Sequence, residues 1–416
     1  MQDLDLKKIK KVFFIGIGGI GISAIARMMF LEGKEISGSD MSENQITQEL
    51  EKLGVKIIIG QSFELIPKDT ELIIYTLAIP HYDKNLFDWV VNSGILYKSY
   101  PQILGLVTAD KYTIAVSGTH GKTTTTAMIA KILIDAGKDP SVVVGSLLKE
   151  YKSNFIIGKS DLFVVEACEY ERSFLNLKPK ILVITNIEAE HLDYYKDLAD
   201  IQSAFKQLST QSERVISDYS KFLGKVPKLL VPGIHNRMNG AAALAVADML
   251  GIDEEVAQKS LAEFSGTWRR LEKKGETKEG TIIYDDYAHH PTEIRASLEG
   301  LRELYPKGDK KITVLFQPHL YSRTKALFED FVKSFKDADQ ILLLPIYFAR
   351  EAKDESVSSE KLAEAMVSLG VDTRAFSSFE LAEDYVKSLN LGSKDVFITM
   401  GAGEAYKVAD KVFDIV

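Results

Sequence analysis

The sequence predicts an α/β protein of several domains, each built on a parallel sheet covered by helices. Apolar, strand-like runs alternate with helix-periodic runs through almost the whole chain, which is the pattern of parallel strands joined by helical crossovers. The 416 residues also exceed one ordinary hydrophobic core, so two or three domains are expected. The pattern separates three blocks, residues 1–110, 111–265 and 266–416.

The first block begins with a strand at 12–15, a Gly-x-Gly-x-x-Gly turn at 16–21 and a helix. A second strand ends at Asp40, about twenty residues later, as in Rossmann-type domains. Such a turn lets a pyrophosphate approach the backbone, and Asp40 can accept a hydrogen bond from a ribose hydroxyl. NAD and a UDP-sugar both carry these groups, so both stay open. The candidate contacts are Gly16, Gly18, Gly19, Ile20, Gly21, Ser39 and Asp40.

The same N-terminal stretch has a second interpretation. Residues 7–11 are rich in lysine and residues 12–26 are apolar, as in a signal peptide. Four glycines interrupt the apolar run and Arg27 ends it, which a strand, turn and helix explain and a signal peptide does not. No other stretch approaches the ~18–20 apolar residues of a membrane helix, so we expect no membrane partner.

The second block carries a phosphate-binding loop. Residues 117–126 read Ser-Gly-Thr-His-Gly-Lys-Thr-Thr-Thr-Thr, between a strand at 112–116 and a helix at 127–133. Backbone N–H groups and the helix N-terminus can wrap a phosphate, Lys122 can neutralise it, and Thr123 can offer a hydroxyl to Mg²⁺. Val116 replaces the first glycine of the full P-loop pattern. A helix cap that merely contains Gly-Lys-Thr is the less favoured alternative. The predicted ATP contacts are Gly118, Thr119, His120, Gly121, Lys122, Thr123 and Thr124.

Two residues near other strand ends are candidates for a magnesium site. Glu166 ends the apolar run 162–166, and His191 follows the run 181–185. Ligands of open α/β sheets bind at this edge, and Mg²⁺ prefers oxygen ligands. Glu166 suits the ion directly, whereas His191 suits a second, looser metal or a hydrogen bond to the transferred phosphoryl group. The alternatives are an ion pair for Glu166 and a helix cap for His191.

Further polar residues lie around the junction of the second and third blocks. Asn236 and Asn239 are three apart at the start of a helix and can hold an adenine or fix a neighbouring loop. A helix cap and a solvent-facing Asn explain them equally well. In the segment 268–272, Arg270 and its neighbour Arg269 suit phosphate contacts. A solvated pair of surface arginines is the alternative.

The third block has strand candidates at 281–284, 312–316, 341–344 and 396–399. Polar clusters follow them at 285–291, 317–319 and 401–404. His289 and His290 near two aspartates would permit a zinc site. Further spaced ligands are missing from the pattern, so a substrate-binding strand end is favoured.

Charge and cysteine content exclude other classes. A net charge of −8 argues against general nucleic-acid binding. The single cysteine, Cys168, excludes an intrachain disulfide and a Cys-based zinc or iron–sulfur site. It also fits a reducing compartment.

Taken together, these motifs resemble the Mur ligase family over nearly the whole chain. The resemblance implies a UDP-sugar domain (1–110), a central P-loop ATPase (111–265) and a C-terminal Rossmann-like domain for an amino acid (266–416). It therefore favours a UDP-sugar over NAD at the first glycine-rich turn. The segments that carry the resemblance are 16–21, 118–123, 185–193, 235–239, 286–293 and 316–324.

The resemblance implies ATP-driven amide formation between UDP-N-acetylmuramate and L-alanine through an acyl phosphate, with segment 316–324 pointing to alanine. It assigns Lys122 to the phosphates, Thr123 and Glu166 to Mg²⁺, and His191 to a second metal. The remaining implied contacts are Asn236, Asn239, Arg270 and Asp286 for ATP, and His289, His290, His319 and Arg323 for the amino acid and muramoyl end. Lys122, Glu166, His191, Arg270 and Asp286 are the expected catalytic residues. A cytoplasmic monomer or homodimer is expected.

Two departures and three rivals accompany this prediction. Leu320 stands where many relatives have Arg, and residues 213–232 are shorter than expected, as if a small β-excursion were missing. The nearest rival is the relative that attaches a whole tripeptide to the same UDP-sugar, which segment 317–323 argues against. A nicotinamide oxidoreductase leaves Lys122 and Glu166 unexplained. Those intact residues also argue against a non-catalytic relative.

Overall fold

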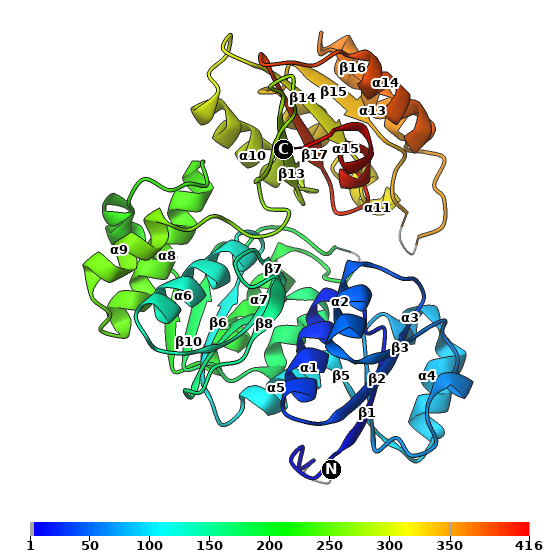
Figure 1. Cartoon of the computed structure of the whole chain (residues 1–416), viewed down its shortest axis with the longest axis vertical. Helices are drawn as coiled ribbons and strands as arrows, with labels where there is room; N and C mark the ends of the chain where they lie inside the picture. The colour runs from blue at the N-terminus through cyan, green and yellow to red at the C-terminus, as the bar shows by residue number, and fades with distance from the viewer. Residues whose placement is uncertain (1–3, 193, 349–350, 416) are drawn as a thin grey trace. The chain divides into compact units, whose positions relative to one another are not determined.

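The computed structural model describes residues 4–192, 194–348 and 351–415 and contains three sheets (Figure 1). The chain forms two compact units. The P-loop unit comprises Met1–Lys225 and Asn239–Leu261, and the C-terminal unit comprises Val226–Met238 and Ala262–Val416. The predicted α/β class is confirmed. The domain boundaries at 110 and 265 stay predictions, and Asp193 of the 185–193 motif lies outside the described residues.

The first sheet of the P-loop unit is parallel throughout, in the order β3-β2-β1-β4-β5. Its strands are β1 (Lys11–Ile15), β2 (Glu35–Asp40), β3 (Lys56–Ile59), β4 (Leu72–Tyr75) and β5 (Leu96–Ser99). Its helices are α1 (Ile20–Leu31), α2 (Gln45–Leu53), η1 (Phe63–Leu65), α3 (Ile79–Tyr82), α4 (Lys84–Asn92) and α5 (Tyr100–Thr108). Because β1 is central, Phe13, Phe14 and Ile15 are all fully buried, so a continuous apolar run encodes this strand.

The second sheet has the order β11-β10-β6-β9-β7-β8 and is parallel except at the β7–β8 pair. Its strands are β6 (Tyr112–Ser117), β7 (Ser141–Leu148), β8 (Ser153–Ile156), β9 (Leu162–Glu166), β10 (Ile181–Ile184) and β11 (Arg214–Ile216). The helices are α6 (Lys122–Asp135), η2 (Tyr170–Asn176), α7 (Leu198–Thr210), η3 (Ser220–Lys225), α8 (Ile234–Met249) and α9 (Glu254–Ala262). Strands β9 and β10 flank β6, so their carboxyl ends meet the P-loop at one edge.

The two sheets of the P-loop unit are joined through α1, which contacts β7 and β8. Asn154 of β8 is fully buried. Its amide donates hydrogen bonds to the carbonyl oxygen of Ile20 and, at 2.8 Å, to Ser23 Oγ. An unpaired buried amide would be costly, so this contact ties the helix that follows the glycine-rich turn to the edge of the P-loop sheet.

The sheet of the C-terminal unit has the order β12-β13-β17-β14-β15-β16 and is parallel except at β12–β13. Its strands are β12 (Glu272–Glu276), β13 (Ile282–Asp286), β14 (Lys311–Phe316), β15 (Gln340–Leu343), β16 (Thr373–Ala375) and β17 (Asp395–Met400). Its helices are α10 (Pro291–Leu304), α11 (Tyr321–Ala326), α12 (Phe328–Ser334), α13 (Ser359–Ser368), α14 (Phe379–Ser388) and α15 (Tyr406–Val412). Hydrophobic clusters cover both faces, as expected for a doubly wound sheet.

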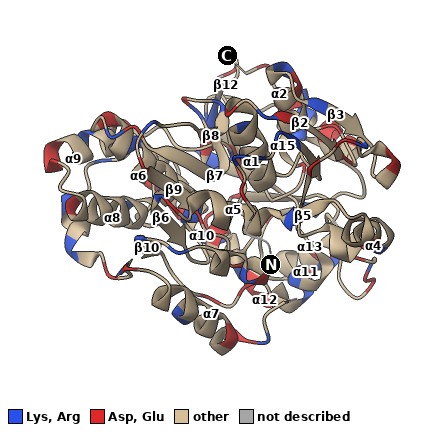
Figure 2. Cartoon of the chain, turned by 90° about the horizontal axis from the view of Figure 1, so that it is seen from below, with Lys and Arg blue, Asp and Glu red and all other residues tan. Residues whose placement is uncertain are grey.

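Charged residues are spread along the whole chain. Figure 2 shows Lys and Arg interspersed with Asp and Glu, in keeping with the modest net charge. Within the described residues, no helix combines the length and the hydropathy needed to cross a bilayer.

Candidate functional site

The glycine-rich turn after β1 is shaped by close packing. Gly16 has φ +78°, and a Cβ there would lie 2.5 Å from Thr76 Cγ2, so the position requires glycine. The N–H groups of Gly16 and Ile17 donate to the carbonyl of Ser39. Gly18 N–H donates to Asp40 Oδ2 at 2.8 Å. The predicted residues of this turn and of the β2 end are therefore brought together, and Asp40 contacts the turn directly.

The P-loop is fastened to the segment that follows β10. Gly118 has φ +137°, and a Cβ there would clash with Thr185 Oγ1. Thr119 N–H donates to the carbonyl of Asn186 at 3.0 Å. The backbone of His120 donates to Asn186 Oδ1 at 2.9 Å, and its carbonyl accepts from Asn186 Nδ2 at 3.0 Å. These bonds fix the backbone of the loop ahead of α6, where the sequence predicts phosphate binding.

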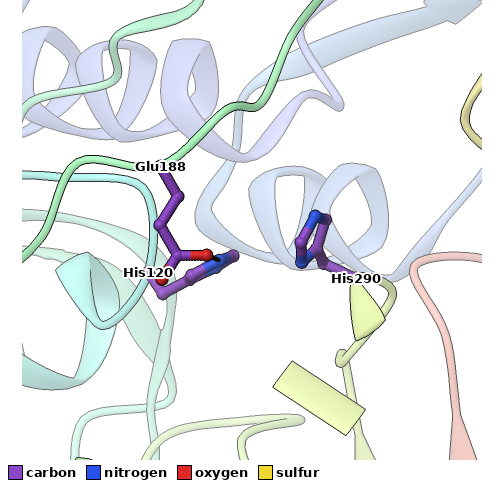
Figure 3. A group of neighbouring side chains, drawn as sticks. All are labelled: His120, Glu188 and His290. Carbon is purple, nitrogen blue, oxygen red and sulfur yellow. Dashed lines mark ion pairs between the residues drawn. The ribbon is translucent and has the colours of Figure 1, made fainter. Parts of the chain in front are cut away.

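The side chain of His120 also faces the segment after β10. Its Nε2 lies 3.5 Å from Glu188 Oε2, and Figure 3 draws the two side chains next to each other. The figure also draws His290, which belongs to the C-terminal unit and is described with it below.

Lys122, the first residue of α6, is held by its own loop and by one carboxylate. Its Nζ donates to the carbonyls of Gly118 (2.6 Å) and Thr119 (2.9 Å) and lies 3.0 and 2.9 Å from the two oxygens of Glu169. Burial acts to lower the pKa of Lys122, but the charge of Glu169 and its neighbours outweighs it, so the pKa is raised. The ammonium group is therefore charged at neutral pH, as phosphate binding requires.

Thr123 and Glu166 form a polar pair beside this lysine. Thr123 Oγ1 donates to Glu166 Oε1 at 3.0 Å, and Gly145 N–H donates to Glu166 Oε2 at 2.6 Å. A Cβ on Gly145 would lie 2.6 Å from either carboxylate oxygen. A hydroxyl and a carboxylate next to a phosphate loop are the oxygen donors that Mg²⁺ prefers. The residues present therefore fit the ion that the sequence predicts.

Glu169 is a residue of this site that sequence reasoning missed. It is 2% exposed and contacts both Lys122 and His191, whose Nε2 lies 3.4 Å from Glu169 Oε1. Burial acts to raise the pKa of Glu169, but Lys122 and His191 outweigh it and the pKa is lowered. The only signal in the sequence was its place three residues after Glu166. Lys122, Glu169 and His191 thus form one row of polar contacts beyond the carboxyl ends of β6, β9 and β10.

In the C-terminal unit, Asp285 and Asp286 end β13 and have different partners. Asp286 is 4% exposed; Ala288 N–H and the hydroxyl of Ser297 donate to its two oxygens, at 3.0 and 2.5 Å. Burial raises the pKa of Asp286 to about 6. Asp285 instead accepts from Thr399 Oγ1 at 2.7 Å and from Arg269. The two neighbouring carboxyls are thus held by separate sets of partners, and burial raises the pKa of both.

Arg269 has a structural role that separates it from Arg270. Its guanidinium is 4% exposed and donates to Asp285 (2.8 Å) and to the carbonyls of Gly401 (2.7 Å) and Gly403 (3.1 Å). It therefore joins the carboxyl ends of β13 and β17 and is not a solvated surface residue. Arg270 lies over the ring of Tyr287 at 5.1 Å and stays the predicted phosphate contact.

Replacing Arg269 with Met is expected to lower the free energy of unfolding by about 3–5 kcal/mol, because Asp285 would be left buried without its counter-charge. The double variant Arg269→Met/Asp285→Asn should recover much of this loss. Arg270→Met is the matched control and should cost about 1 kcal/mol or less. Urea unfolding of the three variants checks this. Equal stability of the Arg269→Met and Arg270→Met variants would contradict it.

The predicted amino-acid contacts also lie in the C-terminal unit. The ring centroids of His289 and His319 lie 6.0 Å apart. Arg323 Nη1 lies 3.2 Å from His319 Nδ1. His290 instead caps α10, accepting from Thr292 N–H at 3.3 Å. Tyr347, which no pattern had singled out, stacks on His319 with ring centroids 5.4 Å apart.

Leu320 lies within this group and has an unusual backbone. It is 6% exposed and has φ +71°, a conformation that non-glycine residues rarely adopt. Its N–H donates to the carbonyl of Tyr347 at 2.8 Å. The side chain is thus part of the local packing and presents no charge where many relatives are expected to carry Arg.

Asn236 and Asn239 are both buried and lie in α8, so the predicted helix is observed and the alternative of a solvent-facing Asn is wrong. In the C-terminal unit, Asn236 Nδ2 donates to the carbonyl of Pro232 at 2.7 Å. In the P-loop unit, the amide of Asn239 lies against Gly121 so closely that a Cβ on that glycine would clash with Oδ1. Both asparagines therefore have structural partners, and their contact with an adenine stays a prediction.

Three family descriptions match the chain. They are "Mur ligase family, catalytic domain" over residues 11–112, "Mur ligase middle domain" over 116–217 and "Mur ligase, glutamate ligase domain" over 269–403. A UDP-N-acetylmuramate–L-alanine ligase of Caldanaerobacter subterraneus is 38% identical over 99% of both chains. One of Caldicellulosiruptor saccharolyticus is 39% identical over 97% of this chain and 98% of its own.

Solved structures show the same architecture. A UDP-N-acetylmuramate-alanine ligase from Thermotoga maritima superposes with a TM-score of 0.83 at 28% identity, covering 97% of this chain and 98% of its own. A murein peptide ligase from Psychrobacter arcticus shares the fold with a TM-score of 0.71 at 21% identity, over 97% of this chain and 98% of its own. The alignment with the Caldanaerobacter relative has 464 positions against 416 residues here, so that relative has residues this chain lacks. That residues 213–232 are one such place stays a prediction.

Proposed function

Because the chain belongs to the Mur ligase family, we propose that it joins L-alanine to UDP-N-acetylmuramate at the expense of ATP, in peptidoglycan precursor synthesis. The observation that carries the proposal is the charged and hydroxyl-bearing group at the P-loop, where Lys122, Thr123 and Glu166 lie on adjacent strand ends. The relatives named UDP-N-acetylmuramate–L-alanine ligase match nearly the whole chain, which supports this choice of substrates.

The reaction proceeds by two displacements. An oxygen of the lactyl carboxylate attacks the γ-phosphorus of ATP, the bond to the β-phosphate oxygen breaks, and ADP leaves. The amine of L-alanine then attacks the carbonyl carbon of the acyl phosphate, and the tetrahedral intermediate expels phosphate with the original carboxylate oxygen. The amine loses a proton in this step. The protein contributes position and charge neutralisation, as in phosphoryl transfer generally.

Lys122 is the central residue of the first displacement. Its ammonium group is charged and already bound to the loop carbonyls of Gly118 and Thr119, so it is fixed where a phosphate would enter. Thr123 and Glu166 would hold Mg²⁺, which supplies further neutralisation of phosphate charge when bound. His191, fixed by Glu169, donates to the transferred phosphoryl group or serves a second metal.

The C-terminal unit supplies contacts to ATP and to the amino acid. We assign Arg270, Asp286 and Asn236 of this unit to ATP, together with Asn239 of the P-loop unit. His289, His290, His319 and Arg323 recognise the amino acid and the muramoyl end, and His290 also caps the start of α10. The first glycine-rich turn, with Ser39 and Asp40, binds the UDP pyrophosphate and ribose. A cytoplasmic location, which cell-wall precursor synthesis implies by analogy, and a monomeric or dimeric state complete the proposal.

Phosphate release tests the assignment. The chain is incubated with ATP, Mg²⁺ and UDP-N-acetylmuramate, and L-alanine, glycine, L-serine or a cell-wall tripeptide is added in parallel. We expect release that needs both the UDP-sugar and L-alanine. Release only with the tripeptide would instead assign the chain to the relative that attaches a whole tripeptide to the UDP-sugar. No release with any acceptor would indicate a non-catalytic relative.

A further inference from the structure

The turn that carries Glu169 has a strained backbone. Glu171 and Arg172 are consecutive and both left-handed, with φ of 51° and 54°. For residues other than glycine this conformation is energetically unfavourable. Two such residues in a row persist only where other contacts impose them. The turn therefore depends on the partners of its side chains.

The side chain of Arg172 has partners near the P-loop, within the P-loop unit. Arg172 Nη2 is 2.6 Å from Asp200 Oδ1, and its guanidinium lies over the ring of Tyr195 at 5.2 Å. The hydroxyl of Tyr195 donates to the carbonyl of Glu169. These contacts fix the second strained residue and the backbone of Glu169 together.

The other partner comes from the first sheet. His81 of α3 places Nε2 2.8 Å from Glu171 Oε1. Its segment begins at Thr76, whose methyl group packs against Gly16 of the glycine-rich turn. A short path of contacts thus runs from the predicted UDP-sugar turn through His81 and Glu171 to the turn that carries Glu169.

We propose that His81 is a positioning residue for the ATP site, acting through Glu171. The His81–Glu171 contact holds the strained turn. The turn then keeps the Glu169 carboxylate in contact with Lys122 and His191. Loss of the pair lets the turn relax and moves the carboxylate that fixes Lys122, so the phosphates of ATP bind less well. This role rests on the proposed function only in naming ATP as the nucleotide.

A double-mutant cycle tests the proposal. His81→Ala, Glu171→Gln and the double variant are compared for binding of a non-hydrolysable ATP analogue by calorimetry, which needs no turnover. Each single variant should weaken binding about threefold to fivefold, the factor that one partly exposed polar contact can supply. The double variant should be no weaker than either single one, because both changes break the same contact. His81→Lys should restore most of the affinity.

Two controls separate this role from a general loss of structure. Lys11→Gln breaks an exposed ion pair at the amino end of β1 and should leave analogue binding unchanged. In turnover, the KM for ATP should rise in the His81 and Glu171 variants while the KM for L-alanine stays within twofold. Unchanged analogue affinity in both single variants, or additive losses in the double variant, would overturn the proposal. A wild type that binds the analogue but shows no alanine-dependent release would overturn the proposed function alone.

Discussion

Replacing Lys122 with Met is expected to lower alanine-dependent phosphate release by at least about a hundredfold to a thousandfold, the loss typical of removing one fixed donor to a developing charge. The ammonium group is held by two loop carbonyls and by Glu169, and no other cation is fixed in this way among the described residues that line the loop. Initial rates at saturating UDP-N-acetylmuramate and L-alanine measure the effect.

The same substitution has a second, separable consequence. Glu169 is 2% exposed, so removal of Lys122 leaves a buried carboxylate without its main counter-charge and should cost about 3–5 kcal/mol of unfolding free energy. Lys122→Met/Glu169→Gln should recover much of the stability but none of the activity. Recovery of activity in that double variant would show that Lys122 acts only through the fold and would contradict its role on phosphate.

Asp286→Asn should have the second-largest effect. The wild-type carboxyl has a pKa of about 6, above its ordinary value of 3.8, so folding favours the protonated form. Its contribution to stability is fully present below pH 3.8 and is lost as the pH rises through about 6. Because Asn never ionises, the variant should gain roughly 3 kcal/mol over wild type between pH 4 and pH 7. Its kcat should nevertheless fall by about a hundredfold or more.

The pH profile of kcat/KM gives the matching kinetic test. Wild-type activity should rise with pH through about 6, as Asp286 ionises. Ser297→Ala removes a hydroxyl that lowers the pKa of Asp286, so this limb should move to higher pH while the carboxylate is kept. A variant Asp286→Asn with near wild-type kcat would remove Asp286 from the reaction, even if the change in stability is as expected.

The central strands could be predicted from the sequence because they are buried on both faces. The runs at 12–15, 112–116, 162–166 and 396–399 all lie inside observed strands. The edge strand β12 gives no such signal, since its sequence Glu-Lys-Lys-Gly-Glu is polar and it is only partly buried. Its pairing with β13 comes from tertiary contact alone.

The site could be predicted only where a motif fixes the backbone. The glycine-rich turn and the P-loop are such places, whereas the three glutamates at 166, 169 and 171 look alike in the sequence. Only the fold shows that Glu169 is the one that lies against Lys122. Likewise, Arg269 and Arg270 are adjacent and chemically equal, and only the positive φ of Arg269 and its burial show which one holds Asp285.

The most direct test of the account is the fate of the carboxylate oxygen of UDP-N-acetylmuramate. This carboxylate is labelled with ¹⁸O, and the phosphate and the nucleotide product formed with ATP, Mg²⁺ and L-alanine are analysed by mass spectrometry. Attack of the carboxylate on ATP, followed by amide formation, predicts one ¹⁸O in each phosphate, ADP as the nucleotide product and an alanine amide of the UDP-sugar. Unlabelled phosphate, or AMP in place of ADP, would contradict the acyl phosphate and with it the role given to the P-loop.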